Sequence, residues 1–300
     1  MLKLLQIILI CSLPFFVIAQ QPDTITKEDL RIAAKVIGID FTEPERDSML
    51  RDVRDNVREY TKMRSLPLNN SVPMTLWQSP LLPGMKFDTK QLPAQWNIPA
   101  NVMMPTNKAD LAFYSILQLA SLIKNKKITS VELTRFFIER IRKYGDTLQC
   151  VISVTEEIAM QQAKAADAEI AKGKYRGLLH GIPYGAKDLL AKKGYKTTWG
   201  SVPFKDQVLD YDATVITRLE EAGAVLCAKL TLGELAWGDV WFGGTTKNPW
   251  NLKRGSSGSS AGSASSVSAG LLPFAIGSET LGSIVSPRSI FCSKLCNVAS

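Results

Sequence analysis

Residues 181–190 read GIPYGAKDLL and place one lysine, Lys187, at the end of a short apolar run framed by glycines. Two more glycine-framed segments follow, GSSGSSAGSASS at residues 255–266 with Ser259 and GSETLGSIVSP at residues 277–287 with Ser283. Glycine lets a backbone approach a site closely because it has no side chain. The three segments therefore point to one site that combines backbone groups with the side chains of Lys187, Ser259 and Ser283.

Helical and strand-like patterns alternate from residue 111 onward, which predicts an α/β fold built of layers. Thr129 and Glu132 form a capping box that begins a helix, and we expect Gly145 to end it. Further helices are predicted over residues 116–123, 156–172 and 215–222, and buried strands over residues 150–155 and 225–229. Lys187 is expected to lie in another buried strand. Residues 251–268 are expected to form a long Gly/Ser loop.

The first 110 residues have a different character. Residues 1–19 carry one lysine before an apolar run and end in small residues, which predicts a cleaved signal peptide and a secreted or periplasmic protein. The run is short for a membrane anchor and contains Pro14, so a stable anchor is not expected. Residues 20–110 are predicted to form a helical extension followed, over 67–105, by an extended segment that wraps a core or by a linker.

Composition narrows the classes of partner. The chain is 45% hydrophobic and carries a formal net charge of +8, but its basic residues alternate with acidic ones and are not interleaved with aromatic residues. We therefore expect a solvated charged surface and no nucleic-acid partner. Export would permit disulfides, but their pairing cannot be assigned; Cys150 and Cys227 are predicted to be buried, and Cys292 and Cys296 have no histidine nearby, so no metal site is expected.

Serine hydroxyls become good nucleophiles only when a base accepts their proton. The one histidine, His180, precedes the G-x-S-x-G pattern around Ser260, whereas in α/β-hydrolases the histidine follows it. We therefore do not interpret Ser260 as the nucleophile of an α/β-hydrolase. A buried lysine can serve instead because burial lowers its pKa. Lys187 fits a buried strand, whereas Lys192, Lys193 and Lys196 are expected to be exposed.

These motifs resemble those of the amidase signature family of serine amidohydrolases. GIPYGAKDLL is similar to its lysine motif, GSSGSSAGSASSV to its glycine/serine loop and GSETLGSIVSP to its nucleophile motif, with support from NPWN and AKLTLGELAW. The interval of 24 residues between Ser259 and Ser283 also matches the family. The resemblance implies a layered α/β fold with a mixed central sheet flanked by helices, of which residues 111–287 would form the N-terminal part.

The resemblance also implies roles for individual residues. Ser283 would be the nucleophile, Ser259 a bridging serine that typically follows a cis peptide bond, and Lys187 the base. The backbone N–H groups of Thr280, Leu281, Gly282 and Ser283 would form the oxyanion hole. The expected activity is hydrolysis of linear amides of small molecules or peptides, with no cofactor and no metal; the oligomeric state stays open.

The sequence departs from the family at three positions and in its last residues. Glu279, Leu281 and Val285 stand where most members have aspartate, glycine and arginine, and residues 288–300, RSIFCSKLCNVAS, diverge entirely. From this tail we expect either a truncation at the C-terminal end or a reading-frame change near Arg288, and a product that is unstable or inactive. Two alternatives remain: a noncatalytic remnant or binding protein, and a subunit of a glutamine-dependent amidotransferase.

Overall fold

The computed structural model has at its centre a five-stranded mixed sheet with the strand order β1–β3–β2–β8–β9. Neighbouring strands are parallel except for β1, which pairs with β3 in the antiparallel sense. The structure describes residues 25–67, 84–86, 88, 90, 96–291 and 298–299, and over these it confirms the predicted α/β fold with a mixed sheet. The strands are β1 Val151–Val154, β2 Pro183–Lys187, β3 Val225–Leu230, β8 Ala275–Ile276 and β9 Val298–Ala299.

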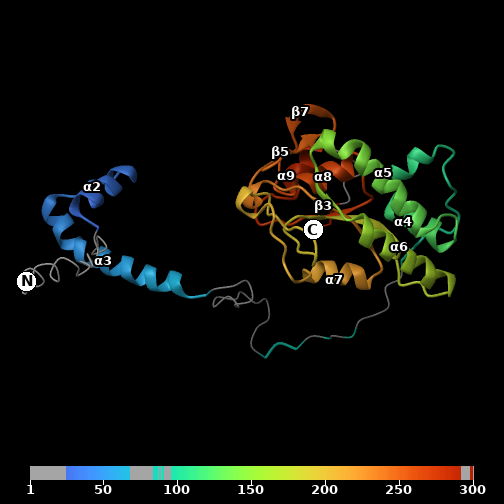
Figure 1. The fold of residues 1–300 in the computed structure, drawn as a ribbon, viewed down its shortest axis with the longest axis horizontal. Coiled ribbons are helices and arrows are strands. Elements are labelled where there is room, and N and C mark those ends of the chain that lie inside the picture. The colour runs from blue at the N-terminus through green and yellow to red at the C-terminus, as the bar shows by residue number, and fades with distance from the viewer. Residues whose placement is uncertain are drawn as a thin grey trace, which may run out of the picture. The chain divides into compact units, whose positions relative to one another are not determined.

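Helices cover both sides of this sheet. Figure 1 shows α5 and α8 on one side of strand β3 and α7 on the other. Helix α5 buries Leu133, Phe137 and Ile141, whose spacing places them on one face, and it begins with the predicted capping box. The helices are α4 Ile116–Lys124, α5 Ser130–Leu148, α6 Glu156–Ala171, α7 Thr214–Glu221, α8 Ala261–Ser268 and α9 Val285–Phe291.

Short elements fill the connections. The 3-10 helices are η1 Lys108–Phe113, η2 Val202–Phe204 and η3 Glu234–Ala236. Two small antiparallel pairs lie between β3 and α8 along the chain, namely β4 Val240–Trp241 with β5 Gly244–Thr245, and β6 Lys247–Asn248 with β7 Asn251–Gly255.

The contacts divide the chain into two units, Met1–Lys90 and Gln91–Ser300. The predicted helical extension consists of two helices in the first unit, α2 Lys27–Val36 and α3 Glu43–Ser65, in which Ala34 is the one buried residue. The predicted signal peptide, residues 1–19, lies outside the described residues. Among the helices that the structure does describe, none combines the length and apolar character needed to cross a bilayer.

The segment before α4 belongs to the second unit. The hydroxyl of Ser121 in α4 donates a hydrogen bond to the carbonyl of Pro99, and Lys127 Nζ donates to the carbonyl of Val102 at 2.8 Å. These bonds hold the extended residues 96–105 along α4.

Two predictions of local structure were wrong. Helix α5 does not end at Gly145 but continues to Leu148, whose buried side chain extends the apolar face; the left-handed residue Gln149 ends the helix. Residues 251–268 do not form a loop either, because they contain β7 and the helix α8. All eight residues of α8 are buried, so packing rather than intrinsic propensity stabilises this helix of small residues.

Helix α8 lies so close to the sheet that one glycine in it is required. A Cβ on Gly262 would lie 2.4 Å from the carbonyl oxygen of Cys150 and 2.5 Å from the backbone nitrogen of Thr231. Because both neighbours are backbone atoms, we expect Gly262→Ala to lower the free energy of unfolding by at least about 2 kcal/mol. Chemical denaturation followed by circular dichroism measures this loss.

Gly145→Ala is the matched control. It also adds a methyl group to a buried helical glycine, but the nearest atom is a side-chain methyl of Val151 at 3.4 Å. The helix propensity of alanine should then leave stability unchanged or raise it by up to about 1 kcal/mol. Equal destabilisation by the two variants would contradict the close approach of α8 to the sheet.

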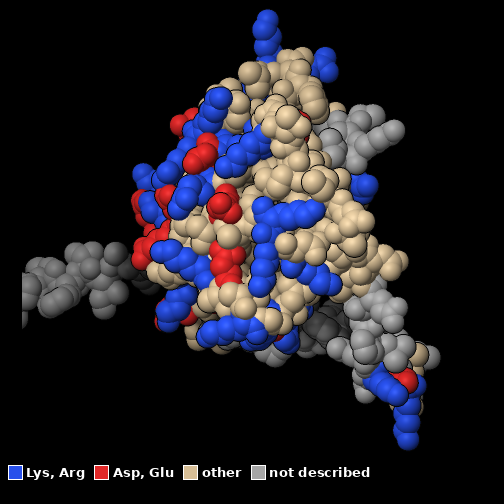
Figure 2. All heavy atoms as spheres, turned by 90° about the vertical axis from the view of Figure 1, so that its right-hand side faces the viewer, with Lys and Arg blue, Asp and Glu red and all other residues tan. Residues whose placement is uncertain are grey.

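The charged surface is mixed in sign. Figure 2 shows many Lys and Arg side chains over one face, with Asp and Glu side chains among them. Some form ion pairs, as Glu169 does with Lys174 at 3.0 Å and with Arg176 at 2.6 Å. The excess of basic residues is thus partly balanced locally, as the alternation of charges along the chain predicts.

Candidate active site

The parallel strands β2, β3 and β8 end at one edge of the sheet, and the candidate residues lie there. Lys187 is the last residue of β2, and the segment 277–284 follows the end of its neighbour β8. Ligand sites of open α/β sheets lie outside such carboxyl ends. The sheet topology therefore explains why the lysine motif and the segment containing Ser283 meet.

Lys187 is fully buried, as predicted, and among the residues that the structure describes its nitrogen Nζ hydrogen-bonds only to uncharged groups. Nζ lies 2.8 Å from Ser259 Oγ, 2.9 Å from Ser278 Oγ, and 3.2 Å from both Ser260 Oγ and the Ser278 carbonyl oxygen. Burial lowers the pKa of Lys187 from 10.5 to about 8, because no carboxylate compensates for the lost hydration of the ammonium form. A substantial fraction of Lys187 is therefore neutral in mildly alkaline solution.

Ser259 lies between the cis peptide bond Gly258–Ser259 and the start of α8. Both Ser259 and the following Ser260 are buried. The Ser260 N–H donates to the carbonyl of Ser283 at 2.9 Å, and the Ser260 hydroxyl donates to the carbonyl of Ser278 at 3.1 Å. Ser260 thus connects the glycine/serine segment with the segment 277–284 through hydrogen bonds, while the Ser259 hydroxyl is hydrogen-bonded to Lys187.

Ser283 is half-buried, and its hydroxyl has no hydrogen-bond partner among the described residues. The structure brings its backbone to Ser260 but forms no direct bond between the Ser259 and Ser283 hydroxyls in this part of the chain. Within the same described range, the N–H groups of Thr280, Leu281 and Ser283 also lack acceptors. The segment therefore presents free donors beside a free hydroxyl.

Glu279 fixes the end of this segment. Its carboxylate accepts hydrogen bonds from the N–H groups of Val285 at 2.9 Å and Ile284 at 2.7 Å. These bonds hold the pKa of Glu279 below its ordinary value because they favour the charged form. Glutamate in place of the family's usual aspartate thus binds the backbone directly after Ser283.

The loop after β3 supports the glycine/serine segment from its other side. The Asp239 carboxylate accepts a hydrogen bond from Ser257 N–H at 2.7 Å, and a Cβ on Gly258 would lie 1.9 Å from the carbonyl oxygen of Gly238. Gly258 is therefore needed for the contact between this loop and the segment that carries Ser259.

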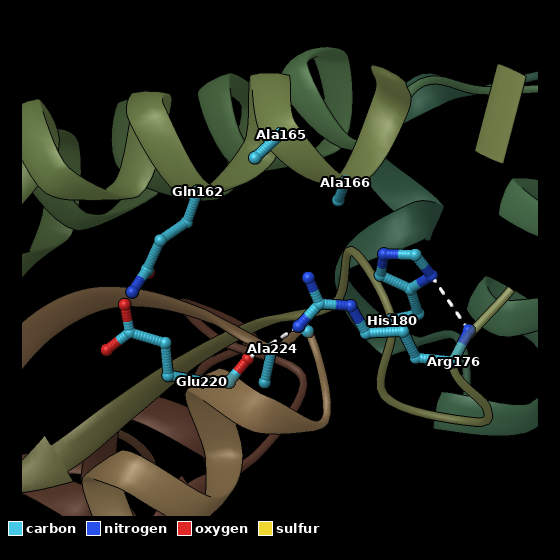
Figure 3. A pocket seen from close by; sticks show the side chains of 8 residues that line it. Gln162, Ala165, Ala166, Arg176, His180, Glu220 and Ala224 are labelled. Atoms are coloured by element: carbon cyan, nitrogen blue, oxygen red, sulfur yellow. Dashed lines mark hydrogen bonds between the residues drawn. The ribbon is translucent and has the colours of Figure 1, made fainter. Parts of the chain in front are cut away.

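His180 occupies a separate pocket. Figure 3 shows it with Arg176, Glu220 and Gln162 around a cavity of about 110 Å³, whose lining includes none of Lys187, Ser259 and Ser283. Its Nδ1 accepts a hydrogen bond from the Arg176 N–H at 3.1 Å, and burial lowers the pKa of His180. The histidine therefore has no part in the arrangement around Lys187.

Sequence reasoning missed Ser278 and the ion pair between Asp188 and Lys229. Ser278 bonds Lys187 through both its hydroxyl and its carbonyl, and its place inside the motif GSETLGS was the available signal. Asp188 follows Lys187 directly, and Lys229 lies within a strand that is otherwise apolar. A charged residue in such a strand indicates a buried partner.

The prediction that Lys192 is exposed was wrong, whereas Lys193 and Lys196 are exposed as predicted. The Lys192 ammonium group bonds Asp212 at 2.6 Å and Glu220 at 3.2 Å, and this pairing makes its burial tolerable. Cys150 and Cys227 are buried and free, in agreement with their predicted burial; Cys292 and Cys296 lie outside the described residues.

Comparisons with known proteins identify relatives of the second unit. The Amidase family model matches residues 132–293. The A subunit of glutamyl-tRNA(Gln) amidotransferase from Coxiella burnetii (strain Dugway 5J108-111) is 44% identical over 179 residues, which cover 59% of this chain and 37% of that protein. The corresponding protein from Marinomonas sp. (strain MWYL1) is 45% identical over 181 residues, with coverage of 59% and 37%.

Solved amidase structures share the fold. The native peptide amidase from Stenotrophomonas maltophilia superposes with a TM-score of 0.57 at 34% identity, over 61% of this chain and 39% of that one. The chain thus spans less than half the length of the relatives it matches. Since the family model covers more than half of its residues, the chain belongs to the amidase family, whose members include hydrolases acting on C–N bonds.

Proposed function

We propose that this chain carries the nucleophile, the bridging serine and the base of an amidohydrolase. Ser283 is the nucleophile, Ser259 relays the proton and Lys187 is the base. The observation that carries the proposal is the environment of Lys187, which is buried, has a pKa lowered to about 8, and lies 2.8 Å from the Ser259 hydroxyl. A buried lysine without a carboxylate partner is costly to the fold, and a role as a proton acceptor explains it.

The reaction follows from these positions. Ser283 Oγ attacks the amide carbonyl carbon, its proton passes to Ser259 Oγ, and the Ser259 proton passes to neutral Lys187 Nζ. The C–N bond then breaks, and the proton returns along the same groups to the leaving amine nitrogen. Water repeats the attack on the acyl ester, which releases the acid and restores the Ser283 hydroxyl.

The backbone of residues 280–283 supplies the electrostatic part. N–H groups without acceptors at Thr280, Leu281 and Ser283, within the described residues, are available to the oxygen that becomes negative during attack. The Gly282 N–H, which the resemblance also assigns to this oxyanion hole, instead contributes to binding the Glu279 carboxylate. Removal of one such donor typically lowers the rate by about a hundredfold or more. Linear amides of small molecules or peptides are the proposed substrates.

A fluorophosphonate probe tests the proposal, because it forms a covalent bond with activated serines. We expect a stoichiometric adduct on Ser283, located by peptide mass spectrometry, and none on the denatured chain. A chain that is folded by circular dichroism but takes no label would overturn the proposal and support the noncatalytic binding protein instead.

A glutamine-hydrolysing amidotransferase subunit is the second candidate. It is favoured by the 44% identity to the Coxiella burnetii protein, against 34% to the peptide amidase. Release of ammonia from glutamine and from a peptide amide, measured side by side on chain that takes the label, separates the two. Preference for the peptide amide supports the hydrolase, and preference for glutamine supports the amidotransferase.

A further inference from the structure

The residue directly after the proposed base is a buried carboxylate. Asp188 and Lys229 are both fully buried, and Lys229 Nζ lies 2.5 Å from Asp188 Oδ1. Asp188 follows the last residue of β2, and its N–H continues the ladder by donating to the Leu230 carbonyl at 2.9 Å. Side chains alternate between the two faces of a strand, so Lys187 and Asp188 point to opposite sides of the sheet. Ala186 is the register partner of Lys229, which places Lys229 on the face of Asp188 rather than on that of Lys187.

Asp188 and Lys229 form hydrogen bonds with each other and with residues 196–198, and not with Lys187 or the serines around it. Asp188 Oδ2 accepts bonds from the Thr198 N–H at 2.7 Å and the Thr198 hydroxyl at 2.6 Å. Lys229 Nζ also donates to the Lys196 carbonyl at 2.9 Å and to the Thr197 hydroxyl at 3.1 Å. The pair therefore fixes the end of β2 and binds it to residues 196–198.

Backbone contacts connect the Asp188–Lys229 pair, through residues 198–200 and the loop after β3, with the segment that contains Ser259. The carbonyls of Trp199 and Gly200, next along from Thr198, accept bonds from the N–H groups of Leu235 and Phe242 at 2.9 and 3.0 Å. These residues belong to the loop that contacts Gly258 through the carbonyl of Gly238. Asp188 and Lys229 thus support both the strand of the base and the loop beneath Ser259.

We propose that Lys229 is a positioning residue for the Lys187 base: by binding Asp188 on the opposite face of the sheet, it neutralises the neighbouring carboxylate, so that Lys187 faces only hydroxyl and carbonyl groups. The inference rests on the proposed function of Lys187. Without Lys229, an uncompensated negative charge would lie one residue from the base and stabilise its ammonium form.

The other charged groups near the site do not replace this effect. In the segment after β8, the Glu279 carboxylate accepts hydrogen bonds from the Val285 and Ile284 N–H groups. On the side of Ser257, the Asp239 carboxylate accepts from the Ser257 N–H. Burial is the cause of the lowered pKa of Lys187, and no charged side chain contributes to it.

The test is the pH dependence of fluorophosphonate labelling at Ser283 in the full chain, from about pH 6 to about pH 10. A unit charge roughly 10 Å away, at an effective dielectric constant of about 20, changes a pKa by about one unit. We expect Lys229→Met to raise the midpoint of the labelling rate by about one pH unit. The rate at neutral pH then falls about tenfold, while the alkaline plateau stays within about twofold.

Two variants separate charge from packing. Asp188→Asn combined with Lys229→Met removes both charges and should return the midpoint to that of the wild type, and Lys192→Met, which breaks a different partly buried ion pair, should leave it unchanged. A midpoint unchanged in Lys229→Met, with only the plateau lowered, would show a merely structural role and overturn the inference.

If Lys229→Met is unfolded by circular dichroism, Asp188→Asn answers the same question with the opposite sign. It leaves the Lys229 charge uncompensated, so the midpoint should fall, and an unchanged midpoint overturns the inference. Failure of the proposed function is distinct, because the wild-type chain would then take no label at Ser283 at any pH.

Discussion

Ser283→Ala is expected to abolish fluorophosphonate labelling and to lower amide hydrolysis by at least about a thousandfold, because no acyl ester can form without the Oγ atom. The substitution removes one oxygen atom from a half-buried side chain that makes no hydrogen bond among the described residues. Stability should therefore change by less than about 0.5 kcal/mol. Steady-state hydrolysis of a peptide amide and thermal denaturation measure the two quantities.

Ser286→Ala is the matched control for this variant. Ser286 lies three residues further on, is also half-buried, and its hydroxyl is bonded to that of Ser257 at 2.8 Å. It should keep its label and most of its activity, since Ser286 has no part in the proton relay. Comparable losses in both variants would indicate that the loop, and not the Ser283 hydroxyl, had been damaged.

Lys187→Met is expected to lower the labelling rate at least about a hundredfold, because it removes the acceptor of the Ser259 proton. Methionine fills a similar volume without a titrating group. In the wild type the rate should rise with pH through about 8, the pKa of Lys187. The residual rate of Lys187→Met should lack this rise, and a variant that retained most of the rate would refute the assigned base.

The same substitution changes how stability depends on pH. Between about pH 8 and the unfolded value of 10.5, the unfolded chain binds a proton at Lys187 that the folded chain does not. The free energy of unfolding should therefore rise with pH across this window, by up to about 3 kcal/mol. Denaturation at several pH values should show the rise in the wild type and its loss in Lys187→Met.

The sequence was informative where a residue's environment is set by its own segment. GIPYGAKDLL contains the short buried strand β2, and Lys187 at the end of that strand could be recognised from the motif. The alternation of helix and strand patterns likewise predicted the layered α/β fold, whereas the mixed sheet was implied by the resemblance to the amidase signature family. Capping at Thr129 needed only residues within one helical turn.

The remainder depends on contacts between distant segments. Residues 261–268 have the composition of a loop and become a helix because they pack against the sheet, where Cys150 and Thr231 flank strands β1 and β3. Lys192 resembles a surface lysine until Asp212, 20 residues away, is placed beside it. Ser278 gains its contact with Lys187 only when β8 pairs with β2. Local sequence patterns do not predict such contacts between distant segments.

Helix α8 links the chemistry of this protein to its folding. An isolated octapeptide of alanine, glycine, serine and valine would not be helical in water, so the position of Ser259 at its start exists only while the sheet and α5 are assembled around it. Covalent labelling at Ser283 would then occur in native molecules and not in partly folded ones. The proposed site would then report whether the second unit as a whole is folded.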